Sequence, residues 1–173
     1  DFTIGSDNEA AGAQGADYVA KVLGKDATGP VLVIEGLSGN ITGQKRARGF
    51  ANRIKKIAPG LVVVASLPGD WDRMKAMSIT NDILTRNPNL KAIFAANDGM
   101  ALGAVEAAYA AGKGDDIIIV GVDEPSVVIL AEIVVPDPVE PVEVTSKVPG
   151  VPPVPPEISL NAKQSPVVVC CNA

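Results

Sequence analysis

Short apolar runs alternate with longer amphipathic stretches through the first 123 residues of the chain. Four runs rich in β-branched residues have the composition of buried strands, at 31–34, 61–64, 91–95 and 117–120. The stretches around them predict helices at about 8–24, 42–58, 71–86 and 98–112. In the third helix, apolar residues fall near one face: Met74, Met77, Ile79, Ile83 and Leu84.

This regular alternation of helices and strands constrains the fold. Strands separated by helices form a parallel sheet with right-handed crossovers, and the helices cover both of its faces. We therefore predict an α/β fold for residues 1–123: a three-layer α-β-α lobe with a parallel, Rossmann-like sheet.

The composition changes after Asp123. Ten of the fourteen prolines lie from Pro125 onward, with one glycine, no arginine and no aromatic residue. Residues 151–156 (VPPVPP) exclude a helix or a central strand. We predict that 124–173 is a separate, extended, proline-rich tail, although valine runs such as 142–144 and 167–169 could pair as edge strands. A linker is the commoner meaning of this composition, and a proline-rich recognition ligand is the alternative.

Bulk properties exclude several classes of function. The net charge of −5 argues against binding to nucleic acid or to an anionic membrane. No leader segment precedes Asp1, so we expect that a secretion signal was removed or never present. The absence of histidine removes the common catalytic triads and zinc sites. The adjacent Cys170 and Cys171 suggest no metal site, and we predict a protein without cofactor, metal or catalytic residues.

The loops at the carboxyl ends of the strands are the place to look for a ligand site, because open parallel sheets bind ligands there. These loops carry Trp71, Asn97 and Asp123, and Arg46 lies one helical turn deeper. Asp, Asn and Arg offer planar partners to neighbouring hydroxyls, and an indole face covers the apolar side of a sugar ring. This set of residues is typical of sugar recognition.

The acidic residues near these loops have a structural reading as well. Asp70 and Asp98 directly precede helices, so we expect them to be N-caps. Asp123 follows a strand with no helical period behind it, which favours a functional role.

The three other candidates also have structural alternatives. Trp71 could fill the core, Asn97 could close a turn, and Arg46 could lie on a solvated helix face. As exposed residues, Arg46 and Asp123 are expected to tolerate alanine at a cost below about 1 kcal/mol.

Six segments, taken together, resemble one family: Ser6–Asn8, Glu35–Asn40, Pro68–Arg73, Asn87–Ile93, Ala96–Gly103 and Val120–Asp123. They are similar, in order and spacing, to the C-terminal lobe of periplasmic sugar-binding proteins of the ribose/allose-binding type. The resemblance covers about 120 of the 173 residues, from Ile4 to Asp123.

The resemblance implies a solute-binding component of a sugar ABC transport system, located in the periplasm or outside the cytoplasm. It implies that Arg46, Trp71, Asn97 and Asp123 contact a monosaccharide, with Trp71 stacking on the ring and the others hydrogen-bonding hydroxyls. In such proteins two lobes close on the ligand, and the closed form docks on a membrane permease or a chemoreceptor.

The chain also departs from the family pattern. It begins about where the family crosses from the first lobe to the second, so the N-terminal lobe is missing. Residues 130–136 could be the strand that returns to the hinge, but Pro136 stands where the family has a ligand-contacting glutamine.

Two other functions on this scaffold are weaker readings. The effector-binding core of a lactose-repressor-type regulator would need a helix-turn-helix and a basic surface, which this chain lacks, and the segments Asp70–Arg73 and Asn97–Met100 favour the transport protein. A sugar-phosphate isomerase or a phosphoacceptor domain is disfavoured by the lack of histidine and of a phosphate loop.

Overall fold

Helices and strands alternate in the order predicted. The computed structural model describes residues 7–122 and 168–170. The elements are α1 (Asn8–Leu23), β1 (Gly29–Glu35), α2 (Ile41–Ile57), β2 (Leu61–Pro68), α3 (Arg73–Arg86), β3 (Ala92–Ala95), α4 (Asp98–Ala110), β4 (Ile118–Gly121) and β5 (Val168–Cys170).

The strands form one sheet in the order β2-β1-β3-β4-β5. All four neighbouring pairs are parallel, which confirms the predicted sheet type. A register shift between Val31 and Leu32 lets the longer β2 follow β1 to its end. The valine run near the end of the chain supplies β5, which pairs with β4 as an edge strand.

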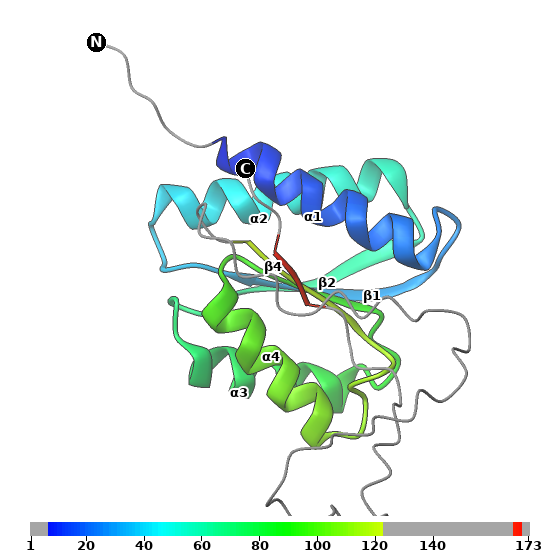
Figure 1. The fold of residues 1–173 in the computed structure, drawn as a ribbon, viewed down its shortest axis with the longest axis vertical. Coiled ribbons are helices and arrows are strands. Elements are labelled where there is room, and N and C mark those ends of the chain that lie inside the picture. Colours follow the sequence, from blue (N-terminus) through cyan, green and yellow to red (C-terminus); the bar gives the residue numbers. More distant parts are fainter. Residues whose placement is uncertain (1–6, 123–167, 171–173) are drawn as a thin grey trace, which may run out of the picture.

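Two helices cover each face of the sheet, so the three-layer prediction is confirmed. Helices α1 and α2 pack together on one face, and α3 and α4 pack together on the other (Figure 1). Central strands in such a sandwich are buried on both sides, and their side chains are therefore apolar without alternation. Thus Val31–Ile34 in β1 and all of β3 are fully buried. Between α2 and β3, Phe50 stacks on Phe94 with ring centroids 4.5 Å apart.

Glycines allow the helices of each pair to touch at the backbone. A Cβ added to Gly12 of α1 would lie 1.9 Å from the carbonyl oxygen of Arg46 in α2. A Cβ on Gly49 of α2 would lie 2.0 Å from the carbonyl oxygen of Glu9. On the other face, a Cβ on Gly103 of α4 would lie 2.1 Å from the carbonyl oxygen of Arg73. Each helix pair is therefore closer than any residue with a side chain would permit.

The third helix differs from its prediction in two ways. It begins at Arg73 instead of residue 71, because Asp70 and Trp71 adopt positive φ angles that a helix cannot contain. The predicted apolar stripe is also wrong in part, since Met74 is 62% exposed. The residues that α3 buries are Ala76, Thr80, Ile83 and Leu84.

Several predictions fall outside the described residues. Asp123, the segments 130–136 and 142–144, and most of the proline-rich tail are among them. The boundary between residues 123 and 124 therefore stays a prediction. Within the described part of the chain, no helix has both the length and the apolar character that a membrane span requires.

Replacing Gly12 by alanine tests the close helix contact. We expect a loss of about 1–3 kcal/mol in the free energy of unfolding, because the new methyl group must push α1 away from α2. Gly99→Ala is the matched control, since a Cβ there meets nothing nearer than 3.8 Å and alanine is favoured in a helix. Chemical denaturation of both variants measures the difference, and equal midpoints would contradict the contact.

Candidate functional site

The carboxyl ends of all the parallel strands lie at one edge of the sheet, as the prediction required. At this edge the chain leaves β1 for α2 on one face, and leaves β3 for α4 on the opposite face. Loops that diverge from neighbouring strands in this way leave a crevice between them, where ligands of open α/β sheets bind. Arg46, Trp71 and Asn97 lie on the elements that meet at this edge.

Arg46 is held at this edge by two hydrogen bonds to backbone and one to the side chain of Asn8. It is only 4% exposed, although it lies on α2 between exposed charged residues. Its Nη1 donates to the carbonyl oxygens of Ala96 (2.9 Å) and Val122 (3.0 Å), and its Nε donates to Oδ1 of Asn8 (2.8 Å). One guanidinium therefore joins the ends of β3 and β4 to the start of α1. The solvated-face interpretation of Arg46 was wrong.

These bonds also place Arg46 next to two other predicted residues. Ala96 and Val122 directly precede Asn97 and Asp123 in the chain. Arg46 has five N–H donors, and the three bonds use those on Nε and Nη1. The other two donors of the guanidinium are on Nη2. Asp123 itself lies just beyond the described segment.

Asn97 is the N-cap of α4. Its Oδ1 accepts a hydrogen bond from the backbone N–H of Met100 (2.9 Å). The expectation that Asp98 would be the N-cap was wrong by one residue, since Asp98 is the first residue of α4. Capping uses only the amide oxygen of Asn97, and its Nδ2 carries two further donors. Asn97 therefore combines the predicted structural role with capacity for a ligand.

Trp71 lies in a tight turn between β2 and α3. The N–H of Asp72 donates to the carbonyl oxygen of Gly69 (2.9 Å), which closes the turn around Asp70 and Trp71. Both central residues have positive φ angles, 54° for Asp70 and 62° for Trp71. For residues other than glycine, such angles cost of order 1 kcal/mol each. Backbone strain of this kind persists only where the surrounding structure holds it.

Two glycines form the surface on which the Trp71 ring lies. A Cβ added to Gly36, after β1, would lie 2.3 Å from Cζ2 and Cη2 of the indole, and one on Gly43 of α2 would lie 3.0 Å from Cη2. The ring is partly buried against the edge of the core. Gly43 precedes Arg46 by one helical turn, so both lie on the same side of α2. Trp71 therefore belongs to the same edge as Arg46 and Asn97. We call Gly36 and Gly43 the indole seat.

Asp70 connects the two loops beside the indole seat. Its Oδ1 accepts from the N–H of Ser38 (3.4 Å), and its Oδ2 accepts from Nζ of Lys75. The hydrogen bond from Lys75 is the main cause that lowers the pKa of Asp70 below its ordinary value, since it favours the carboxylate. The expectation that Asp70 caps a helix was wrong. Asp72 is the N-cap of α3 and accepts from the N–H of Lys75 (2.6 Å).

Sequence reasoning missed three contributors to this edge: Asn8, Gly36 and Gly43. Asn8 lies in a segment that carried the family resemblance, and this was the only signal for it. The two glycines carried a weak signal, since glycine in the first turn of a helix, as at position 43, is unfavourable unless something approaches closely.

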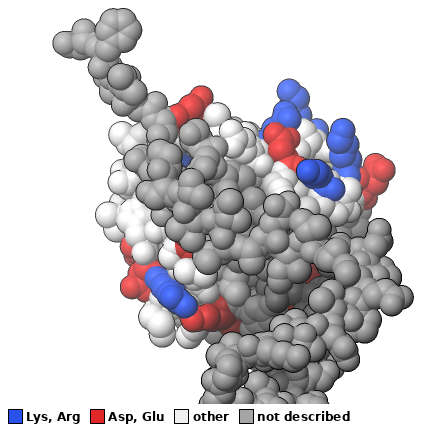
Figure 2. All heavy atoms as spheres, viewed as in Figure 1, with Lys and Arg blue, Asp and Glu red and all other residues white. Residues whose placement is uncertain are grey.

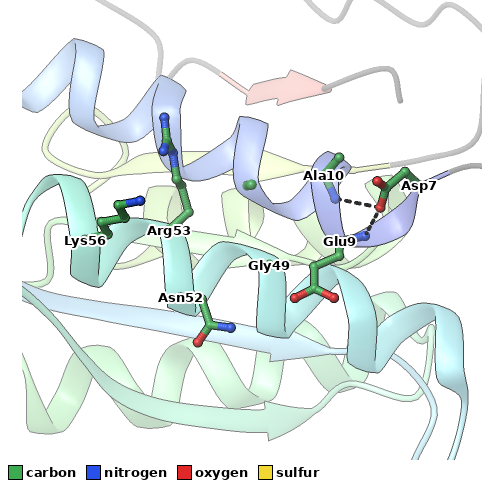
Figure 3. Close-up of a pocket in the computed structure, with 8 residues that line it drawn as sticks. Asp7, Glu9, Ala10, Gly49, Asn52, Arg53 and Lys56 are labelled. Atoms are coloured by element: carbon green, nitrogen blue, oxygen red, sulfur yellow. Dashed lines mark hydrogen bonds between the residues drawn. The ribbon is translucent and has the colours of Figure 1, made fainter.

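A groove lies between α1 and α2, and its lining begins at Asp7 and Glu9, on either side of Asn8. Its volume is about 450 Å³, and its lining includes Asp7, Glu9, Asn52, Arg53 and Lys56 (Figure 3). Charges of both signs gather over these helices (Figure 2), and the ion pairs Arg48–Glu9 and Arg53–Asp17 join them at 2.8 Å. The groove contains none of the predicted ligand residues. Within the described residues, no group of three acidic or cysteine side chains could hold a metal ion.

Comparison with known proteins identifies the family. The periplasmic binding protein domain matches residues 1–131. The chain belongs to this family. The D-allose-binding periplasmic protein of Escherichia coli is 44% identical over 120 residues, and the ribose import binding protein of the same organism is 39% identical over 120 residues. Each alignment covers 69% of this chain and 38% or 39% of the relative.

A solved structure agrees with these relatives. A periplasmic solute-binding protein of an ABC transporter from Actinobacillus succinogenes, with bound D-allose, is 38% identical and has a TM-score of 0.65. The match covers 69% of this chain and 41% of that structure. The resemblance to the ribose/allose-binding type and the fold class are thus confirmed. The chain spans about two fifths of the length of these proteins.

Family membership also bears on the competing functions. The family consists of sugar-binding proteins of transport and is not a family of enzymes. The relatives named above are binding proteins, and nothing in the comparisons favours the repressor alternative.

Replacing Arg46 by alanine should destabilise the fold, in contrast to the expectation from sequence. The variant removes the donor to the carbonyl oxygens of Ala96 and Val122 and to Oδ1 of Asn8, and we expect a loss of about 2–4 kcal/mol in the free energy of unfolding. Arg48→Ala removes an arginine from the same helix but only an exposed ion pair. Its denaturation midpoint should stay close to that of the unmodified chain, and a similarly mild Arg46→Ala would show that the three bonds contribute little.

Proposed function

We propose that this chain is the C-terminal lobe of a monosaccharide-binding protein that serves a sugar ABC transporter. The sugar binds at the carboxyl edge of the sheet, where Arg46, Trp71, Asn97 and Asp123 contact it.

One observation carries this proposal. The Nη1 of Arg46 bonds the residues that precede Asn97 and Asp123, while the helix of Arg46 also supplies part of the indole seat under Trp71. The guanidinium of Arg46 is therefore bonded next to Asn97 and at the strand end that precedes Asp123, and its helix carries part of the surface under Trp71.

The chemistry of this edge suits a sugar with several hydroxyls. The two donors on Nη2 of Arg46 and the two on Nδ2 of Asn97 can bind hydroxyl oxygens, and the carboxylate of Asp123 can accept from hydroxyl groups. The indole of Trp71 covers the C–H face of the ring. Relatives named for D-allose and for ribose support a monosaccharide ligand of this size.

The partners follow from the relatives. The relatives are about two and a half times as long as the 120 residues that match this chain, and we infer that their remainder supplies a second lobe, which would close over the sugar from the opposite side. We propose that the closed protein delivers the sugar to a membrane permease outside the cytoplasm, as the names of the periplasmic relatives suggest. A chemoreceptor is a further partner that the family resemblance implies.

Sugar binding can be measured directly through the intrinsic fluorescence of Trp71, the only tryptophan of the chain. Ribose, allose or another aldose should change the emission and raise the melting temperature. One lobe makes only part of the contacts, so we expect a dissociation constant of about 1 mM, near −4 kcal/mol. Flat emission and an unchanged melting temperature across a panel of aldoses at millimolar concentration would contradict the proposal.

Asn97→Asp separates ligand binding from helix capping. Aspartate keeps the capping oxygen but replaces the two donors on Nδ2 by an acceptor, so the fold should stay intact while the response to sugar weakens by about tenfold or more. Asn40→Asp is the matched control. Asn40 caps α2 in the same way, and its replacement by aspartate adds the same charge at the same edge. Asp123→Ala should also abolish the response. Sugar binding that survives in Asn97→Asp would exclude Asn97 as a ligand.

A further inference from the structure

Lys75, the partner of Asp70, lies at a position in α3 that is unfavourable for a positive charge. Lys75 lies in the first turn of α3, and the dipole of a helix disfavours positive charge at that end. The first turn of α3 contains no acidic residue that would offset this charge. Its Nζ instead reaches back to Oδ2 of Asp70, in the turn before the helix.

The position of Lys75 is itself fixed. Asp72 caps α3 by accepting from the backbone N–H of Lys75. The side chain of Lys75 therefore starts from a defined point and folds back over the turn that carries Trp71. The other carboxylate oxygen of Asp70 accepts from the N–H of Ser38, in the loop that follows β1. The carboxylate spans the two loops that border the indole.

Trp71 needs a restraint of this kind. A bulky residue with a φ of 62° is unfavourable by itself, and its neighbour Asp70 has a φ of 54°. The indole seat supports one edge of the ring, but glycine offers no side chain to grip it. The carboxylate of Asp70 joins this strained turn to Ser38 and to Lys75.

We propose that Asp70, held by Lys75, is a positioning residue that fixes the indole of Trp71 over Gly36 and Gly43. The inference rests on the proposed function in one respect only, namely that the fixed ring is the surface on which the sugar stacks. The orientation of the ring itself is a property of the unliganded protein.

The experiment compares Asp70→Ala, Asp70→Asn and Lys75→Met by the near-UV circular dichroism and the acrylamide quenching of Trp71, without sugar. Asp70→Ala should weaken the tryptophan dichroism and increase quenching, and Lys75→Met should do the same. Asp70→Asn should fall between Asp70→Ala and the unmodified chain, because the amide oxygen still accepts from Ser38. The double variant Asp70→Ala/Lys75→Met should add little to Asp70→Ala, since Asp70→Ala already removes the pair with Lys75.

Two further variants calibrate the result. Gly36→Ala pushes the ring off its seat without touching Asp70, so its spectrum shows what a displaced indole looks like. Asp116→Asn breaks an exposed lysine–aspartate pair far from the site, between Lys113 and Asp116, and should leave the tryptophan signals unchanged. Far-UV dichroism shows that each variant is folded. If Asp70→Ala fails to fold, Lys75→Met and Asp70→Asn still decide the question.

The outcomes distinguish the two proposals. Tryptophan signals that change in Asp70→Ala and Lys75→Met support the positioning role, even if no sugar binds. If the unmodified chain binds sugar, the same variants should weaken its affinity by about twofold to fivefold, the scale of one exposed ion pair. Signals identical to those of Asp116→Asn in all three variants would overturn the role of Asp70, whatever the sugar titration shows.

Discussion

The burial of a single guanidinium organises this protein. An arginine in the interior is unfavourable unless hydrogen bonds replace its water, and Arg46 obtains them from the ends of two strands and from the start of α1. Those carbonyls belong to loops that leave the sheet and would otherwise be free to diverge. The arginine therefore ties the start of α1 to the ends of β3 and β4, which are already paired in the sheet. A ligand that binds its remaining nitrogen would meet a group whose position is already fixed, so little ordering is lost on binding.

The side chains at the site are held in place mainly by contacts with backbone atoms. Arg46 bonds carbonyl oxygens, Asn97 and Asp72 cap helices through backbone N–H groups, and the indole of Trp71 lies against glycine. Because every residue has the same backbone, such contacts are difficult to recognise in a sequence. They also place side chains that can serve two roles: Asn97 caps a helix with its oxygen and keeps its nitrogen for a ligand.

The fold was predictable because burial on both faces leaves a direct record in the chain. Runs such as Val31–Ile34 are apolar without interruption, and their spacing by helices dictates parallel pairing. The details at the strand ends were less accessible. Arg46 lies between two exposed charges and gives no periodic sign of burial. The N-caps of α3 and α4 were misassigned because several polar residues precede each helix and only the turn geometry selects one. The positive φ angles of Asp70 and Trp71 could not be predicted, because neither residue is glycine or asparagine.

The glycine contacts within each helix layer have a mechanical consequence. Because α1 touches the backbone of α2 at Gly12 and Gly49, neither helix can slide or roll against the other without collision. Gly103 imposes the same restriction on α3 and α4. Displacement of one helix relative to its neighbour within either layer is therefore hindered. A force applied at the strand ends would therefore move the two helices of a layer together.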